Sequence, residues 1–162
     1  IKIYLSKSYK KSYSLNFDIT IFTGPIDEYF NYKYGRLSYR TVYWKKKNFL
    51  KNDYQGNAII NYNDPNVPYT RIIEPQHFNP ERQNNGTTIF YEYSKETTQK
   101  DIPYYPKRLE KDKIKLNKYL KEIKRSKNIY FLGRLGTYRY LDMHIVIKES
   151  LEFFKKNKKI LV

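Results

Sequence analysis

The chain has 162 residues, with 32 lysines and arginines, 16 aspartates and glutamates, and no cysteine. The absence of cysteine excludes disulfides, thiolate metal sites and a cysteine nucleophile, and it is typical of a cytoplasmic protein. No apolar run approaches the roughly 20 residues that a transmembrane helix needs, and no signal-peptide pattern is present. We therefore expect a cytoplasmic protein that is long enough to form a real core.

The net charge of +16 raises nucleic-acid binding as an alternative function, because clustered lysines and arginines neutralise backbone phosphates. Nineteen tyrosines offer stacking surfaces for single strands. Lysine, asparagine, isoleucine and tyrosine are frequent together, however, which is typical of an AT-rich coding sequence. Much of the charge also falls on an expected helix at 111–127 and in the tail at 155–159. A basic nucleic-acid-binding module is therefore the weaker alternative.

The first two thirds of the chain predict strands without long helices between them. Residues 1–14 form a polar lead-in, and the sequence leaves open whether it is ordered or disordered. Alternating residues predict a strand at Leu15–Phe22, which ends at the turn Thr23-Gly24-Pro25. Four further strands are expected, at Arg40–Trp44, Asn57–Tyr62, Tyr69–Ile73 and Thr87–Tyr93. Such a succession favours an antiparallel sheet.

The pattern changes after residue 108. A helix is predicted over Leu109–Lys127 from an apolar stripe at Leu109, Leu116, Tyr119, Leu120 and Ile123. A buried strand at Ile129–Leu132 and a glycine turn follow. A second helix then presents one apolar face, made of Met143, Val146, Ile147, Leu151 and Phe154. This order is typical of an α/β nucleotide-binding layer.

The eleven residues from Gly133 to Met143 point most directly to function. They contain Gly133, Arg134, Gly136 and Tyr140, and they lead to Asp142, a favoured N-cap of the second helix. Glycines allow a ligand close to the backbone, and arginine matches phosphate oxygens in two-point geometry. A helix N-terminus adds unpaired N–H groups and a partial positive charge. The segment therefore predicts a site for an anionic, diphosphate-bearing ligand.

Arg71 lies within a strand-like apolar segment and needs an anionic partner, because burial of an unpaired charge is costly. The sequence leaves three options open: a pair with Glu74, a pair with Glu92, or a bound ligand. Glu74 and His77 have the Glu-x-x-His spacing of di-iron carboxylate sites. Those sites need a helix and a second copy of the motif, whereas Pro75 interrupts this single copy. We therefore expect no metal site.

Several separated segments together resemble the UDP-galactopyranose mutase family. They occur in the family's order, and the resemblance covers nearly all of the chain from about residue 18 to residue 154. They are Phe22–Phe30, Gly35–Arg40, Gln55–Tyr62, Pro68–Glu74, Pro103-Tyr104-Tyr105-Pro106 and the Gly133–Met143 segment. Any one of these motifs alone would be weak evidence.

The resemblance implies an isomerase, an intramolecular transferase that interconverts UDP-galactopyranose and UDP-galactofuranose for cell-surface glycan biosynthesis. It implies FAD in its reduced form, whose N5 atom forms an adduct with the sugar while UDP departs and returns. The implied fold is α/β with α+β character: an antiparallel substrate-side sheet, then the strand, turn and helix of a Rossmann-like FAD-binding domain.

The resemblance also implies roles for single residues. Arg71 and Arg134 match the catalytic arginines. The implied substrate-binding set is Arg71, Tyr105, Tyr140, Glu92 and Asp142, and the implied FAD-binding set is Arg134, Gly133, Tyr140, Asp142 and Met143. Within these sets, Arg71 and the two tyrosines would meet the diphosphate, and the Met143 helix start would face the reduced flavin.

The chain departs from the family pattern in ways that affect competence. It lacks the Gly-x-Gly-x-x-Gly fingerprint for the flavin pyrophosphate, the glycine-rich histidine loop and the uridine-stacking aromatics. It also has Pro75-Gln76-His77 where the family usually has His-Lys-His. We expect a C-terminal part of a mutase whose N-terminal segment acts in cis or in trans, with weak or no FAD binding by these residues alone.

Three regions are expected from the sequence: the lead-in at 1–14, a sheet-rich substrate-side region at 15–108, and a helix–strand–helix region at 109–162 that completes the FAD domain. The alternatives that remain are an inactive truncated or split mutase fragment and the nucleic-acid-binding module. A homo-oligomer is a further option for the assembly.

Overall fold

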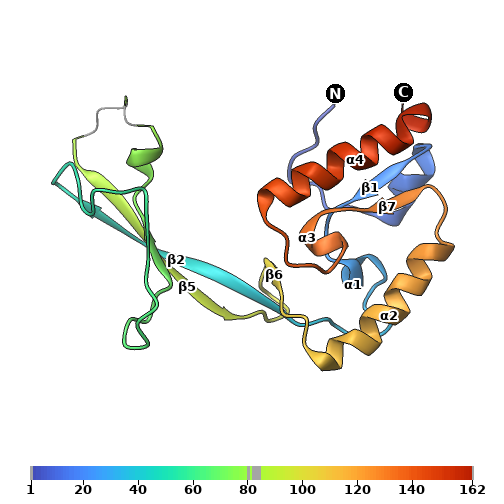
Figure 1. Ribbon diagram of the computed structural model, residues 1–162, viewed down its shortest axis with the longest axis horizontal. Helices are drawn as coiled ribbons and strands as arrows, with labels where there is room; N and C mark the ends of the chain where they lie inside the picture. The colour runs from blue at the N-terminus through green and yellow to red at the C-terminus, as the bar shows by residue number, and fades with distance from the viewer. Residues whose placement is uncertain (1, 80, 82–84, 162) are drawn as a thin grey trace. The chain divides into compact units, whose positions relative to one another are not determined.

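The computed structural model describes residues 2–79, 81 and 85–161 (Figure 1). The chain forms two compact units. Unit 1 comprises Ile1–Tyr39 and Tyr105–Val162, and unit 2 comprises Arg40–Tyr104. This division differs from the regions expected at 15–108 and 109–162, because residues 15–39 belong with the C-terminal segment. The physical reason is that a strand at 20–22 pairs with a strand at 129–131 in unit 1.

Unit 1 is built on two parallel strands, β1 (Thr20–Phe22) and β7 (Ile129–Phe131), with Thr20 opposite Ile129 and Phe22 opposite Phe131. The strand predicted at Leu15–Phe22 is therefore wrong over its first half. Residues Lys11–Asn16 instead form the 3-10 helix η1. Because β7 offers only three residues for pairing, the strand begins at Thr20, and the exposed Leu15 and Phe17 lie outside it.

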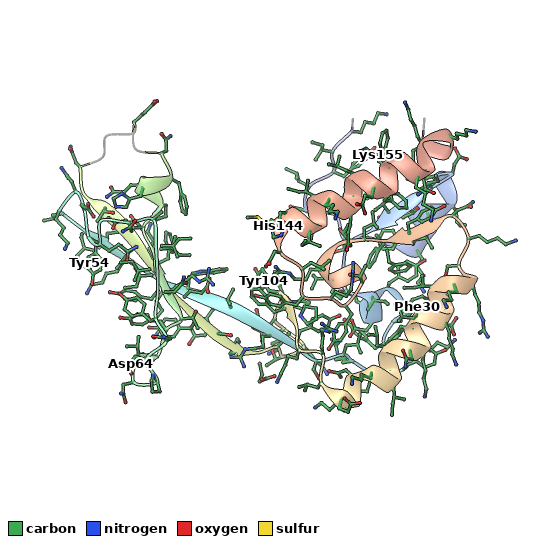
Figure 2. All side chains as sticks on the ribbon, viewed as in Figure 1. Phe30, Tyr54, Asp64, Tyr104, His144 and Lys155 are labelled. Atoms are coloured by element: carbon green, nitrogen blue, oxygen red, sulfur yellow. The ribbon has the colours of Figure 1, made fainter. Side chains whose placement is uncertain are left out.

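One face of this strand pair meets α1 (Ile26–Tyr29) and α2 (Glu110–Arg125). Phe30 follows α1 (Figure 2). Its ring stacks on Tyr119 of α2 at a centroid distance of 5.7 Å. The buried core of this face comprises Ile26, Leu37, Tyr39, Tyr119, Ile129, Phe131 and Tyr138. The helix predicted at Leu109–Lys127 is confirmed, although Leu120 of its expected apolar stripe is 38% exposed.

The other face of the strand pair meets α4 (Met143–Leu161), which the sequence also predicted. The rings of Tyr130 in β7 and Phe153 in α4 lie 4.8 Å apart. Figure 1 shows α4 along this side of β1 and β7. The short helix α3 (Gly133–Gly136) connects β7 to the segment before α4. Most of the predicted apolar face of α4 is exposed, at Met143, Ile147, Leu151 and Phe154.

Unit 2 is an antiparallel sheet, as predicted. Its long strands are β2 (Tyr39–Phe49) and β5 (Thr87–Glu96), paired from Arg40 opposite Glu96 to Phe49 opposite Thr87. The spatial order of its strands is β3-β4-β5-β2, in which the short strands are β3 (Ile59–Asn61) and β4 (Arg71–Ile73). Strand β6 (Tyr105–Pro106) is next to β2 in the strand order, but its residues belong to unit 1. A 3-10 helix, η2 (Pro75–Phe78), follows β4. Strand β2 extends beyond the predicted end at Trp44, because its residues Lys45, Lys46 and Lys47 also pair with β5.

The sheet of unit 2 is held by side-chain contacts between neighbouring strands. Ile72 of β4 and Ile89 of β5 are buried. Tyr43 of β2 and Tyr93 of β5 stand opposite each other with stacked rings, 5.0 Å between centroids. Such cross-strand aromatic pairs stabilise antiparallel sheets. None of the helices in the described part of the chain has the length and apolar character needed to cross a bilayer.

Candidate functional site

Arg71 in unit 2 forms an ion pair across the sheet. It stands opposite Glu92 in the β4–β5 register, and its Nε lies 2.9 Å from Glu92 Oε1. The Nε–H is not aligned with the line to that oxygen, so the contact is an ion pair without hydrogen-bond geometry. Glu92 is only 6% exposed and also accepts a hydrogen bond from Thr70 Oγ1. Of the two protein partners that the sequence left open for Arg71, the structure selects Glu92.

This pairing leaves part of the Arg71 side chain accessible, because it is 37% exposed. A guanidinium carries five N–H donors, and the ion pair with Glu92 is made by Nε. Glu92 therefore fixes the orientation of Arg71 and neutralises part of its charge. An oriented arginine of this kind can still present two parallel donors to an anion.

Arg134 in unit 1 lies against two tyrosine rings. Its Cζ is 4.9 Å from the centroid of Tyr105 and 5.0 Å from that of Tyr140. The two rings are stacked at 24° with centroids 5.7 Å apart. Nε and Nη2 of Arg134 both donate to the carbonyl of Leu141. Three residues that the sequence assigned to the site are thus in contact, and the arginine is fixed in place.

The two glycines of the Gly133–Met143 segment have different structural roles. Gly133 has φ +74°, a left-handed conformation that lets the chain turn from β7 into α3. Gly136 has an ordinary helical conformation, but a Cβ there would lie 2.9 Å from the carbonyl oxygen of Phe22 in β1. Only glycine allows α3 to approach β1 this closely. The expected turn between strand and helix is therefore a single helical turn packed on the sheet.

Asp142 and Met143 stand where the sequence placed them, at the start of α4. The Asp142 carbonyl accepts the N–H groups of Ile145 and Val146, so Asp142 occupies the N-cap position. Met143 is 82% exposed. The first turn of this 19-residue helix therefore faces outward from unit 1, with the partial positive charge of a helix N-terminus.

The predicted site residues fall into two groups. Arg71 and Glu92 are together in unit 2. Arg134, Tyr105 and Tyr140 are together in unit 1, in the same segment as Gly133, Asp142 and Met143.

Tyr138 belongs to the same segment, but the sequence did not predict a role for it. Its side chain is 1% exposed, and burial together with the neighbouring Asp112 raises the pKa of its phenol above the ordinary value. The residue also has φ +50°. This tyrosine supports the segment from inside the core, and no local sequence signal separates it from the exposed Tyr140.

Comparisons with known proteins identify the family that this chain resembles. Residues 1–140 match the family model described as UDP-galactopyranose mutase. The chain is 42% identical over 152 residues to a probable UDP-galactopyranose mutase of Klebsiella pneumoniae, covering 94% of this chain and 39% of that protein. It is 43% identical over 141 residues to the dTDP-fucopyranose mutase of Escherichia coli, covering 85% of this chain and 37% of that protein.

A UDP-galactopyranose mutase of Mycoplasma pneumoniae is 31% identical over 137 residues, with 81% of this chain and 34% of that protein covered. The chain therefore spans about two fifths of the length of the curated relatives it matches.

Proposed function

The chain belongs to the UDP-galactopyranose mutase family, and we propose that it acts within an isomerase that interconverts UDP-galactopyranose and UDP-galactofuranose. The observation that carries this proposal is the position of Arg134, held by the Leu141 carbonyl against the rings of Tyr105 and Tyr140. A fixed cation flanked by phenols is suited to a diphosphate, because it offers charge and hydrogen-bond donors from one small surface.

We propose FAD as the cofactor, and the residues present fit part of its site. Gly133 and Gly136 keep side chains away from the backbone between β7 and α3. Arg134 supplies a fixed positive charge, and the α4 start at Asp142 and Met143 supplies helix N–H groups. With Tyr140, these residues would hold a ring system that is anionic after reduction. Reduced flavin supplies the nucleophile of this reaction when it is bound.

The remaining tasks belong to the substrate-side residues. We propose that Arg71 binds the diphosphate through the side of its guanidinium away from Glu92, so that leaving-group charge is stabilised as it develops. The phenol hydroxyls of Tyr105 and Tyr140 would donate hydrogen bonds to diphosphate oxygens. Glu92 and Asp142 are the carboxylates of the set, and Glu92 acts by orienting Arg71.

We further propose that this mutase needs a polypeptide segment with the Gly-x-Gly-x-x-Gly fingerprint, supplied in cis or in trans. That fingerprint is absent from the 162 residues, and the relatives are much longer than the matched region. The strand pair β1–β7 with helices on both faces is consistent with one part of a Rossmann-like FAD domain.

The sugar nucleotide has a second candidate. A relative named dTDP-fucopyranose mutase is 43% identical, against 42% for one named UDP-galactopyranose mutase. Both names describe a pyranose mutase acting on a nucleoside-diphosphate sugar. Both substrates should therefore be assayed in parallel, and the faster reaction identifies the substrate class of this chain.

The test replaces the matching 152-residue region of the Klebsiella relative with this chain and measures furanose formation with FAD under reducing conditions. The 162-residue chain by itself is assayed in parallel. We expect turnover in the chimera and at least a roughly hundredfold loss in its Arg134→Ala variant, the size of effect seen when a transition-state donor is removed. Arg139→Ala is the matched control, because Arg139 belongs to the same segment but pairs with Glu149 of α4.

Two results would reject the proposal. Normal turnover in the Arg134→Ala chimera would remove the arginine from the site. An inactive chimera that still folds and binds FAD would favour the inactive-fragment alternative. Salt-sensitive binding of the chain to DNA or RNA at physiological ionic strength would instead support a basic binding module.

A further inference from the structure

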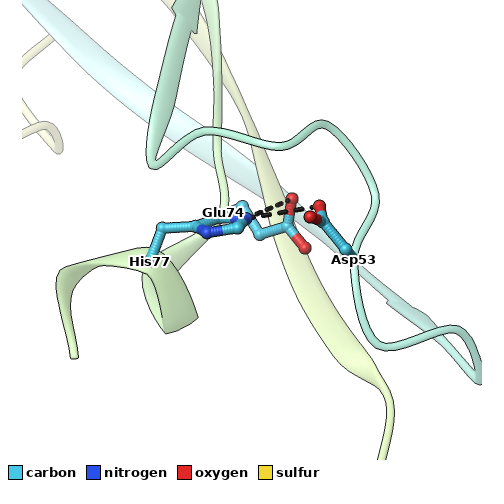
Figure 3. A group of neighbouring side chains, drawn as sticks. All are labelled: Asp53, Glu74 and His77. Atoms are coloured by element: carbon cyan, nitrogen blue, oxygen red, sulfur yellow. Dashed lines mark hydrogen bonds and ion pairs between the residues drawn. The ribbon is translucent and has the colours of Figure 1, made fainter. Parts of the chain in front are cut away.

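A cluster of three potential metal ligands lies in unit 2, apart from the residues assigned to the mutase reaction. Asp53 is in the loop after β2, Glu74 follows β4, and His77 is in η2 (Figure 3). His77 Nε2 lies 3.3 Å from Asp53 Oδ1 and 3.5 Å from Glu74 Oε2. One ligand atom from each residue falls within 4.8 Å of the other two. Imidazole and carboxylate groups are common ligands of divalent cations.

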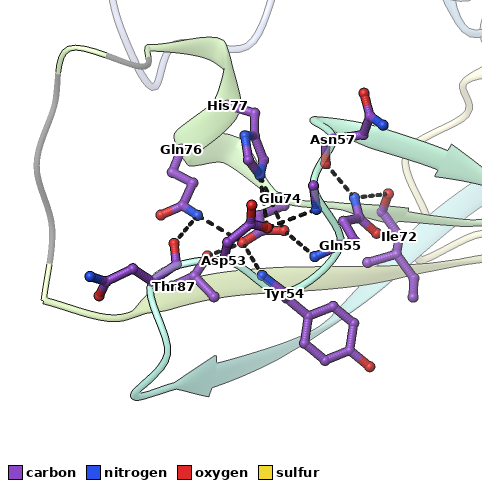
Figure 4. A network of polar contacts seen from close by, with 11 residues as sticks. Asp53, Tyr54, Gln55, Asn57, Ile72, Glu74, Gln76, His77 and Thr87 are labelled. Atoms are coloured by element: carbon purple, nitrogen blue, oxygen red, sulfur yellow. Dashed lines mark hydrogen bonds and ion pairs between the residues drawn. The ribbon is translucent and has the colours of Figure 1, made fainter.

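The Glu74 carboxylate is fixed by its surroundings, as Figure 4 shows. The residue is fully buried. Its Oε1 accepts hydrogen bonds from Tyr54 N at 2.9 Å, Gln76 Nε2 at 2.9 Å and Thr87 Oγ1 at 2.6 Å. Its Oε2 accepts Gln55 N at 2.9 Å. These partners are neutral donors, so they orient the carboxylate without balancing its charge, and Oε2 keeps room for a partner on the His77 side.

Asp53 is fixed in a similar way from the other side. Its Oδ1 accepts the backbone N–H of Gly56 at 2.7 Å, which fixes the loop around the carboxylate. The side chain of Asp53 is 53% exposed and that of His77 is 26% exposed. The cluster therefore has one fully buried ligand and two that border solvent, so an ion can enter without unfolding of the sheet.

The distances fit coordination of an ion as well as direct pairing, in which His77 Nε2 and Asp53 Oδ1 form a long hydrogen bond. Charge-assisted N–H···O hydrogen bonds are usually about 2.7–2.9 Å long, and both contacts of His77 Nε2 are longer than that. In a tetrahedral zinc site with ligand bonds of about 2.0–2.1 Å, neighbouring ligand atoms are about 3.3–3.4 Å apart. Two of the three separations, 3.3 and 3.5 Å, match this edge length, and the third pair of ligand atoms lies within 4.8 Å. Two carboxylates also supply the negative charge that a divalent ion balances.

We propose that Asp53, Glu74 and His77 bind one divalent transition-metal ion of the zinc class. His77 Nε2, Asp53 Oδ1 and Glu74 Oε2 would be its ligands, and water would complete the tetrahedron. The objection from sequence, that a di-iron site needs two helical copies of Glu-x-x-His, does not apply to a mononuclear site. Its third ligand comes from a loop more than 20 residues earlier in the chain. The ion would join that loop to η2 and, through Thr87, to β5.

The test is calorimetric titration of the full 162-residue chain with Zn²⁺ in metal-free buffer. We expect one ion per chain. His77→Gln and Asp53→Asn should each weaken binding at least about tenfold, the range seen even for the loss of outer-shell groups at metal sites. His144→Gln is the matched control, because His144 is the only other histidine and lies in unit 1. Asp53→Asn retains an oxygen that can accept the Gly56 N–H.

A second measurement uses Co²⁺ as a spectroscopic substitute for Zn²⁺. The intense visible bands of tetrahedral Co²⁺ should appear with the wild-type chain and with His144→Gln, and they should be absent with His77→Gln. The alternative to a metal is a protonated His77 that bridges the two carboxylates directly. Absence of Zn²⁺ binding would overturn the proposal in favour of that ion pair. Equal binding by His77→Gln, or loss of binding in His144→Gln, would also overturn it, because the ion would then bind elsewhere.

Discussion

The hydroxyl of Tyr138 lies 3.0 Å from Asp112 Oδ2, and both side chains are almost completely buried. The same hydroxyl is 2.7 Å from the Ser38 carbonyl oxygen, and Ser38 Oγ donates to Asp112 Oδ1 at 3.1 Å. The contact therefore ties the segment before α4 to the first turn of α2 and to the chain before β2. A buried carboxylate depends on such donors for its stability.

Tyr138→Phe should destabilise the protein by about 1–3 kcal/mol, because it removes a donor from a buried acceptor without filling the space. Urea unfolding followed by circular dichroism measures the effect. Tyr140→Phe is the matched control two residues away. Its ring is 57% exposed, so its effect should stay within about 0.5 kcal/mol. Equal stability of the two variants would show that the Tyr138–Asp112 contact contributes little.

The two glycines around α3 should respond differently to substitution. Gly136→Ala puts a Cβ against the backbone of β1, which cannot move aside, and should cost about 1–3 kcal/mol. At Gly133 the nearest atom to a new Cβ is 4.0 Å away, so the cost there arises from the left-handed backbone.

Asparagine tolerates the left-handed conformation better than alanine does. Gly133→Asn should therefore be more stable than Gly133→Ala in thermal unfolding, whereas Gly136→Asn should be no more stable than Gly136→Ala. A rescue by asparagine at Gly136 would contradict the close approach of α3 to β1.

Asp27 should make stability depend on pH. It is buried and accepts hydrogen bonds from Leu37 N at 2.9 Å and Tyr39 Oη at 3.0 Å. Burial outweighs these bonds and raises the pKa of Asp27 above its ordinary 3.8. The folded state therefore holds the proton more tightly than the unfolded chain. This stabilising contribution is complete below pH 3.8 and is lost as pH rises through the native pKa.

Asp27→Asn stays uncharged, so its stability relative to wild type should increase between about pH 4 and pH 7. Urea unfolding across this range gives the difference. Asp18→Asn serves as a control for removal of an exposed carboxylate. A difference between Asp27→Asn and wild type that is constant or falls with pH would contradict the raised pKa.

Arg71 should combine a structural and a functional role that substitution can separate. Arg71→Ala leaves Glu92 buried without its cation and should cost about 1–2 kcal/mol, a value reduced by the partial exposure of the arginine. Arg71→Lys keeps the charge but loses the two-point donor geometry. It should therefore retain most of the stability while activity in the chimera falls as far as in Arg71→Ala.

A double-mutant cycle with Glu92→Gln measures the Arg71–Glu92 pair itself. The cost of Arg71→Ala should shrink in the Glu92→Gln background, because the uncompensated charge is no longer there. Additive effects of the two changes would show that the ion pair is not energetically coupled.

Local patterns explain what the sequence could predict. The helices at 110–125 and 143–161, the strand at 129–131 and the strands of the antiparallel sheet follow from periodicity within a few residues. The Gly133–Met143 segment could be predicted as a site for the same reason, since its glycines, arginines and helix start are adjacent in the chain.

The tertiary structure decided which distant residues meet. Pairing of β1 with β7 limits β1 to Thr20–Phe22, and the β4–β5 register gives Arg71 to Glu92 rather than Glu74. The fold places Asp53 beside Glu74 and His77, a loop contact that no local spacing reveals. These contacts join positions about 20 to 110 residues apart, whose proximity depends on strand register and packing. The sequence by itself determined the elements and the chemistry available to them, because propensity and periodicity act locally. Tertiary packing decided how that chemistry is combined.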